Sequence, residues 1–170
     1  MEKNFLKNDE YRPNVAIVIL NKKGEVLWCK RKSNDGWQFP QGGIDKNETP
    51  KQAILRETKE EVGLSSKDIK IICELSKWLK YDVPKNRRQT YFFKKNKFRG
   101  QVQRWFMAEL TSHESKIDLG GDKVNEFSSW MWVSYWYALG SVVSFKKKLY
   151  RQALTGLLPE YNQFISRKRL

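Results

Sequence analysis

The chain has 170 residues, and its 33 Lys and Arg against 19 Asp and Glu give a formal net charge of +14 at pH 7. A length of this order suits one domain with a sizeable core, and a content of 39% hydrophobic and 14% aromatic residues excludes a disordered chain. No apolar run approaches the ~20 residues of a membrane span, so we expect a single domain over residues 1–170 and no membrane partner.

The first third of the chain predicts a hairpin followed by a short strand. The apolar run 15–20 predicts a strand buried on both faces, residues 21–24 a turn, and residues 25–31 the returning strand. Residues 37–41 predict a short strand that leads to a pair of glycines. Glycine at that point allows the backbone to approach a ligand closely or simply to turn.

A capped helix is predicted between Thr49 and Gly63. Thr49 can cap its N-terminus, Pro50 suits the first helical position, and Gln52 lies where a capping-box partner reaches back. Gly63 lies where helices commonly end in a left-handed residue. The arc that should be buried contains Ile54, Leu55, Thr58 and Val62.

A second arc of this helix carries three carboxylates, Glu57, Glu60 and Glu61. Their spacing makes them neighbours, so they repel one another unless a cation lies between them. Oxygen-only ligands indicate a hard divalent ion, Mg²⁺ with Mn²⁺ as the alternative, which would share its coordination with substrate phosphates. A plain solvated acidic face gives the same pattern. Arg56 could pair with Glu48 and hold the preceding loop against the helix.

Four strands and one long helix are predicted in the rest of the chain. The strands cover residues 69–75, 78–83, 101–110 and 130–133, and an amphipathic helix runs from Val142 to about Leu158, followed by a loose basic tail at about 159–170. The stretch 84–100 is basic and interleaved with aromatic residues. It suits a mobile loop over a polyanionic substrate, or a solvated loop whose rings pack on the core.

Histidine and cysteine contribute little chemistry. The single histidine, His113, lies in a polar loop stretch, so any base must be a carboxylate or a metal-activated water. Cys29 and Cys73 lack ligand-like spacing and are expected to be reduced residues of a cytoplasmic protein. The excess of positive charge favours a polyanionic partner such as nucleic acid or a nucleotide polyphosphate, although solubility alone would also account for it.

The stretch 42–64 resembles the Nudix box. The matching positions are Gly42, Glu48, Arg56, Glu57, Glu60, Glu61, Gly63 and the aliphatic Leu64. Thr58 departs from the family pattern, which usually has a bulky aliphatic residue there. Further blocks, WQFPQGG and WVSYWY among them, are similar to the bacterial RNA pyrophosphohydrolases, a Nudix subgroup also described as (di)nucleoside polyphosphate hydrolases. The matching blocks run from about Tyr11 to Tyr150.

This resemblance implies an α/β fold of the Nudix type, an α/β/α sandwich with a mixed central β-sheet. It implies an RNA 5′-pyrophosphohydrolase that needs a divalent metal and converts 5′-triphosphate or diphosphate RNA ends to 5′-monophosphate, which promotes mRNA decay. Pyrophosphate or successive phosphates would be released. The implied partners are RNA 5′ ends and nucleotide polyphosphates, and the sequence identifies no stimulating protein.

The resemblance also implies roles for individual residues. The metal ligands and catalytic carboxylates would be Glu57, Glu60, Glu61 and Glu126, the last of which could bind a second cation or orient the attacking water. The phosphates and the first nucleotides would contact Arg12, Arg31, Tyr81, Phe145 and Lys146. The structural positions of the box would be Gly42, Gly43, Glu48, Arg56 and Gly63. Position 36 is Gly, where relatives can offer a serine.

Two other functions stay open from the sequence. The same site could cleave dinucleoside polyphosphates of the diadenosine tetraphosphate or pentaphosphate type, since these also place a nucleotide beside a polyphosphate. A protein of another class, a non-catalytic RNA-binding Nudix module, would have the same fold. Against the latter, no carboxylate of the box is missing.

Overall fold

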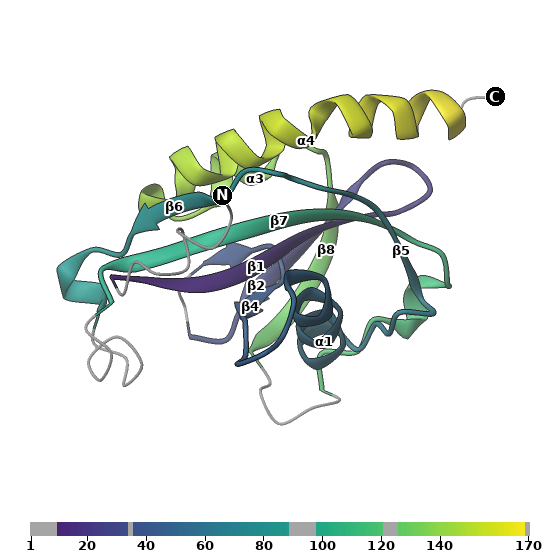
Figure 1. The fold of residues 1–170 in the computed structure, drawn as a ribbon. Coiled ribbons are helices and arrows are strands. Elements are labelled where there is room, and N and C mark those ends of the chain that lie inside the picture. The colour runs from purple at the N-terminus through teal and green to yellow at the C-terminus, as the bar shows by residue number, and fades with distance from the viewer. Residues whose placement is uncertain (1–9, 34–35, 89–97, 121–125, 169–170) are drawn as a thin grey trace.

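A mixed sheet of eight strands lies between helix α1 on one face and helices α3 and α4 on the other (Figure 1). The computed structural model describes residues 10–33, 36–88, 98–120 and 126–168. In chain order the elements are β1 (Tyr11–Leu20), β2 (Val26–Arg31), β3 (Trp37–Gln38), β4 (Gln41–Gly43), α1 (Pro50–Val62), β5 (Ile69–Glu74), β6 (Leu79–Asp82), η2 (Lys85–Arg87), β7 (Gly100–Leu110), η3 (Glu114–Lys116), β8 (Phe127–Val133), α3 (Ala138–Ser141), η4 (Ser144–Lys146) and α4 (Lys147–Lys168). The predicted α/β/α sandwich is confirmed.

Strands β1 and β7 form the middle of the sheet and run parallel, from Tyr11 opposite Gly100 to Leu20 opposite Glu109. The other strand pairs of the described sheet are antiparallel. Strand β2 meets β1 only where Val26 lies opposite Leu20, and then pairs with β8. The predicted hairpin is therefore present but short, and strand β4 occupies the first half of the same edge of β1. This exchange of neighbours brings the glycine pair beside α1.

Alternating side chains of β1 divide the core into two layers, as expected for a strand buried on both faces. Odd-numbered positions such as Ile17 pack toward α1, and even-numbered positions such as Val18 pack toward α4. Both side chains are 0% exposed. On the α4 side, Trp28, Phe39 and Tyr150 form an aromatic cluster, in which the Phe39 and Tyr150 rings stack with centroids 5.4 Å apart. Both faces of the sheet are thus covered by packed side chains, and the functional site lies at the ends of the strands.

Helix α1 has the predicted caps. The Thr49 hydroxyl accepts from the Gln52 backbone N–H at 3.2 Å, the Gln52 side chain accepts from the Thr49 N–H at 2.9 Å, and Gly63 adopts φ 73°. Thr58 is buried at the position where the family usually has an aliphatic side chain, and its hydroxyl donates to the Ile54 carbonyl at 2.6 Å. The hydroxyl is therefore satisfied within the helix. Leu55, expected in the buried arc, is only half-buried.

The C-terminal segment differs from the prediction. Instead of one helix from Val142 to Leu158 and a loose tail over 159–170, a short 3₁₀ turn precedes α4, which continues to Lys168. Pro159 lies inside α4, where proline removes a backbone hydrogen bond. The prediction of a loose tail was wrong because tertiary contacts stabilise this half of the helix.

These contacts join the second half of α4 to the turn between β1 and β2 (Figure 1) and to the end of β7. The Tyr161 hydroxyl donates to the Gly24 carbonyl at 3.1 Å, and Lys168 Nζ lies 2.6 Å from Glu109 Oε1.

Among the described residues, the helices include none with the length and apolar character of a membrane span.

Candidate active site

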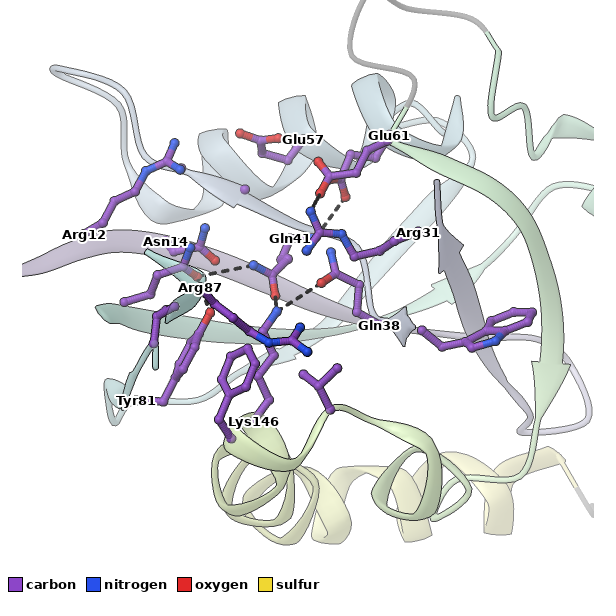
Figure 2. Close-up of a pocket in the computed structure, with 18 of the residues that line it drawn as sticks. Arg12, Asn14, Arg31, Gln38, Gln41, Glu57, Glu61, Tyr81, Arg87 and Lys146 are labelled. Atoms are coloured by element: carbon purple, nitrogen blue, oxygen red, sulfur yellow. Dashed lines mark hydrogen bonds and ion pairs between the residues drawn. The ribbon is translucent and has the colours of Figure 1, made fainter. Parts of the chain in front are cut away.

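A cavity of about 400 Å³ gathers the residues predicted from the sequence (Figure 2). All nine residues predicted as catalytic or substrate-binding line it: Arg12, Arg31, Glu57, Glu60, Glu61, Tyr81, Glu126, Phe145 and Lys146. We call one part the acidic end, formed by Glu57, Glu60, Glu61 and Glu126. We call the other part the amide end, formed by Gln38, Gln41, Tyr81, Gln101, Phe145 and Lys146. Figure 2 shows Glu57 and Glu61 on the α1 side of the cavity and Lys146 on the α4 side.

Arg56 fixes the acidic end from behind. It pairs with Glu48 through two bonds, Nε to Oε1 at 2.9 Å and Nη2 to Oε2 at 2.8 Å, and Nη2 also donates to the Gly43 carbonyl at 2.8 Å. Its Nη1 reaches Glu57 Oε1 at 2.8 Å and Glu60 Oε2 at 3.2 Å. The hydrogen bond from Arg56 lowers the pKa of Glu48. The predicted pairing of Arg56 with Glu48 is confirmed, and it holds the loop after β4 against α1.

Glu61 is the most deeply buried carboxylate of the acidic end. It is 3% exposed, and its Oε2 accepts a hydrogen bond from the Gln41 backbone N–H at 2.9 Å. Burial raises the pKa of Glu61 well above its ordinary value, and the negative charges of Glu126 and Glu57 raise it further. Burial also raises the pKa of Glu57, although Arg56 opposes that shift. A negative charge on Glu57 or Glu61 is therefore unfavourable unless a cation binds beside it.

Glu126 faces the helix from the segment before β8, as predicted. Its Oε1 lies 3.0 Å from Arg31 Nη2, and its backbone carbonyl accepts from the Lys32 N–H at 2.9 Å. Arg31, the last residue of β2, thus holds the fourth carboxylate of the acidic end.

The glycine pair of β4 admits two functional side chains. A Cβ atom on Gly42 would lie 1.8 Å from Cδ of Glu57, and one on Gly43 would lie 2.3 Å from Nη2 of Arg12. Real Cβ atoms essentially never make such contacts, so a side chain at either position would displace the Glu57 carboxylate or the Arg12 guanidinium. The close approach expected at these glycines is therefore made to the Glu57 carboxylate and the Arg12 guanidinium.

The donor set of the acidic end fits a hard divalent cation, because it offers only carboxylate oxygens in a cluster of like charge. Within the described residues, no three His, Cys, Asp or Glu side chains are arranged to hold a metal ion by themselves. Mg²⁺ commonly takes only one or two carboxylates and completes its shell with water and substrate phosphates. The arrangement suits an ion that arrives with its substrate.

A network of amides holds Lys146 at the other end of the cavity (Figure 2). Lys146 is 5% exposed, and its Nζ donates to Gln38 Oε1 and Gln41 Oε1, both at 3.0 Å. Gln101 Oε1 accepts from Tyr81 Oη at 2.8 Å and from Gln41 Nε2 at 3.3 Å. None of these three glutamines was predicted from the sequence as a site residue. The available signal was a polar residue within a largely apolar predicted strand. A residue of that kind has many possible partners, so the pattern does not identify a binding site.

Two rings lie over this network. The Tyr81 and Phe145 rings stack with centroids 6.0 Å apart and planes at 29°, and the Arg87 guanidinium lies 5.8 Å from the Phe145 centroid. Tyr81 is 8% exposed, and burial raises its pKa above the ordinary value, so its hydroxyl stays a hydrogen-bond donor. Phe145 is only half-buried and is the more accessible ring. The aromatic residues at positions 91–93 of the predicted basic loop 84–100 lie outside the described residues.

The fold and the acidic cavity agree with sequence comparison. A model of the NUDIX domain matches residues 10–153, and the chain belongs to the Nudix family. A protein of Actinobacillus succinogenes named RNA pyrophosphohydrolase is 48% identical over 157 residues, covering 92% of this chain and 77% of that protein. A protein of the same name from Pasteurella multocida is 52% identical over 146 residues, covering 86% and 73%.

A solved structure shares the fold at low sequence identity. The dihydroneopterin triphosphate pyrophosphohydrolase of E. coli superposes with a TM-score of 0.68 at 22% identity, covering 85% of this chain and 97% of that one. At this identity the likeness supports the fold alone.

Proposed function

We propose that this chain is an RNA 5′-pyrophosphohydrolase, which converts 5′-triphosphate or diphosphate RNA ends to 5′-monophosphate and so promotes mRNA decay. The observation that carries the proposal is the high identity, 48% and 52%, to relatives named RNA pyrophosphohydrolase. The cavity supports it, because an acidic end suited to a metal-bound polyphosphate adjoins an end suited to a nucleobase.

Each end has its own part in the reaction. Arg12 and Arg31 hold phosphate oxygens at the acidic end, where Arg56 keeps Glu57 and Glu60 in place. Phe145 stacks on a base of the first nucleotides, and Lys146, fixed by two glutamines, donates to that base or its phosphate. This places the terminal phosphates of the RNA beside the carboxylates.

Glu57, Glu60, Glu61 and Glu126 are the residues that would hold a divalent cation, Mg²⁺ or Mn²⁺. The cation supplies neutralisation of phosphate charge and a lowered pKa for the attacking water. A carboxylate, Glu126 or one of the three on α1, accepts the proton from the water. Attack on phosphorus then breaks the anhydride bond, and the leaving phosphate or pyrophosphate departs from the acidic end.

Product analysis tests the proposal directly. A short 5′-triphosphate RNA and diadenosine tetraphosphate are incubated separately with the protein, with Mg²⁺ and with EDTA. We expect Mg²⁺-dependent conversion of the RNA to 5′-monophosphate, with a kcat/KM well above that for the dinucleotide. A preference for the dinucleotide would instead favour dinucleoside polyphosphate hydrolysis, and no turnover of either substrate would favour a non-catalytic RNA-binding module.

A further inference from the structure

A row of cations begins where the cavity ends. Lys147, Lys148 and Arg151 are exposed on the first turns of α4, directly after Phe145 and Lys146 of the cavity wall. In the part of the chain that the structure describes, none of the three cations forms an ion pair. The sequence contains no Asp or Glu from position 138 to 159. We call these three residues the α4 cation row.

The α4 cation row is unfavourable for the helix that carries it. The beginning of an α-helix has a partial positive charge, which favours acidic side chains and disfavours Lys and Arg. The first turn of α4 contains no acidic residue. A local choice that opposes the stability of its own element is typical of a functional site. An anion placed against these residues would interact favourably with the side chains and with the helix.

A second positive segment borders the same part of the cavity. Arg87, in the turn after β6, lies over the Phe145 ring, and Lys85 of the same turn is exposed. Figure 1 shows β6 beside the beginning of α4, and contacts join β6 to both η4 and α4. The cavity therefore has carboxylates at one end and cations around the other.

We propose that the RNA beyond its first nucleotides binds along the α4 cation row, with Lys147, Lys148 and Arg151 contacting its phosphodiester backbone. This inference rests on the proposed function. With the terminal phosphates at the acidic end and a base on Phe145, the rest of the RNA leaves the cavity past the half-buried Phe145, just before α4 begins. The binding is independent of sequence, since phosphate contacts position a nucleic acid without reading its bases.

The proposal predicts a dependence on RNA length. Lys147 and Arg151 are four residues apart, about 6 Å along the helix axis, so the row adjoins the cavity and extends beyond it. An RNA of two nucleotides lies entirely within the cavity, whereas an RNA of twelve nucleotides extends out of it and places phosphates beside the α4 cation row. Only the longer RNA should gain affinity from these side chains.

The test compares 5′-triphosphate RNAs of two and twelve unpaired nucleotides that begin with the same two bases. The variant Lys147→Gln/Lys148→Gln/Arg151→Gln should lower kcat/KM for the twelve-nucleotide RNA by about 10-fold at low salt and leave the two-nucleotide RNA unchanged. The slope of log(kcat/KM) against log[salt] for the longer RNA should become shallower by about 0.7 for each lost phosphate contact.

A matched control removes the same charge elsewhere. Lys22→Gln/Lys23→Gln/Lys116→Gln alters three exposed lysines, two of them in the β1–β2 turn near the other end of α4, and should leave both RNAs unchanged. Equal losses on both RNAs, equal losses in the control, or no loss in the α4 variant would each overturn the inference. These results presuppose an active wild-type protein, whereas a wild type inactive on both RNAs would refute the proposed function itself.

Discussion

The two ends of the cavity manage charge in opposite ways. At the acidic end, several carboxylates converge, and Arg56 balances two of them from behind at 2.8 and 3.2 Å. At the amide end, one buried ammonium, that of Lys146, is held by neutral oxygens of Gln38 and Gln41. The acidic end has an excess of negative charge that a bound metal ion can neutralise. The amide end is already satisfied by hydrogen bonds and offers a fixed shape to a base.

The two ends also differ in how the chain builds them. Three carboxylates of the acidic end come from a single helix, α1, whereas the side chains of the amide end come from β3, β4, β6, β7 and η4. Gln41 connects the ends, because its backbone N–H binds Glu61 while its side chain binds Lys146 and Gln101. A change at the acidic end should therefore affect turnover, and a change at the amide end should affect affinity.

The largest effect is expected from Glu61→Gln. The substitution keeps an oxygen for the Gln41 N–H but removes the negative charge with which Glu61 would hold the divalent cation of the proposed reaction. We expect kcat to fall by about 10³-fold, the upper range for loss of one preorganised electrostatic contact, with little change in the KM for RNA. Steady-state kinetics with saturating Mg²⁺ measures both. A variant with near-normal kcat would remove Glu61 from the catalytic group.

The same variant should be more stable than the wild type in EDTA. Because burial raises the pKa of Glu61, the folded state keeps its proton at a pH where the unfolded chain has lost it. The free energy of unfolding therefore decreases as the pH rises above 4.5, the ordinary pKa of the group. Glu61→Gln removes this loss, so its Tm should exceed that of the wild type by a margin that grows as the pH rises above 4.5. Parallel Tm profiles would contradict the burial argument.

Two adjacent glycines allow a sharper comparison at the acidic end. Gly42→Ala puts a methyl group where the Glu57 carboxylate lies, and displacement of a catalytic group by about 1 Å can lower kcat by about 10²-fold. Gly43→Ala meets only the flexible end of Arg12, so we expect a smaller effect, mainly on KM. Kinetics on one triphosphate RNA distinguishes them. Equal kcat losses in both variants would indicate a general disturbance of β4.

Phe145→Ala tests the amide end. Stacking of a base on an aromatic ring contributes ~1–3 kcal/mol, so KM for the RNA should rise about 5- to 150-fold while kcat stays near that of the wild type. Phe145→Tyr keeps a ring and serves as the control. A loss confined to kcat would show that the two ends do not divide affinity from turnover.

The sequence was sufficient for the three carboxylates of α1 because helix geometry is local, whereas Glu126 was predicted only from the family resemblance. The spacing of Glu57, Glu60 and Glu61 determines their relative positions once the caps at Thr49 and Gly63 define the helix. The pairing of Arg56 with Glu48 bridges only eight positions. Short-range rules of this kind need no knowledge of the rest of the fold.

The amide end and the second half of α4 depend on long-range contacts. Gln41 and Gln101 are sixty positions apart, and their contact requires the register of β4 and β7 against β1. Helix α4 continues past Pro159 because Tyr161 binds the β1–β2 turn, which no local pattern indicates. The family resemblance located Tyr81, Phe145 and Lys146, but the glutamines that hydrogen-bond Tyr81 and Lys146 emerged only from the structure.

The smallest effect is expected inside the amide network, from Gln101→Leu and Tyr81→Phe. Gln101→Leu leaves the buried Tyr81 hydroxyl without its acceptor, which should lower the free energy of unfolding by ~1–3 kcal/mol. Tyr81→Phe removes the same bond but leaves Gln101 two other donors, so it should cost only about 1 kcal/mol. The double variant should lose less than the sum of the single changes, with a coupling of about 1 kcal/mol in urea unfolding. Additive losses would mean that the hydroxyl and the amide do not meet in solution, and the amide end would then lack the fixed shape that separates it from the acidic end.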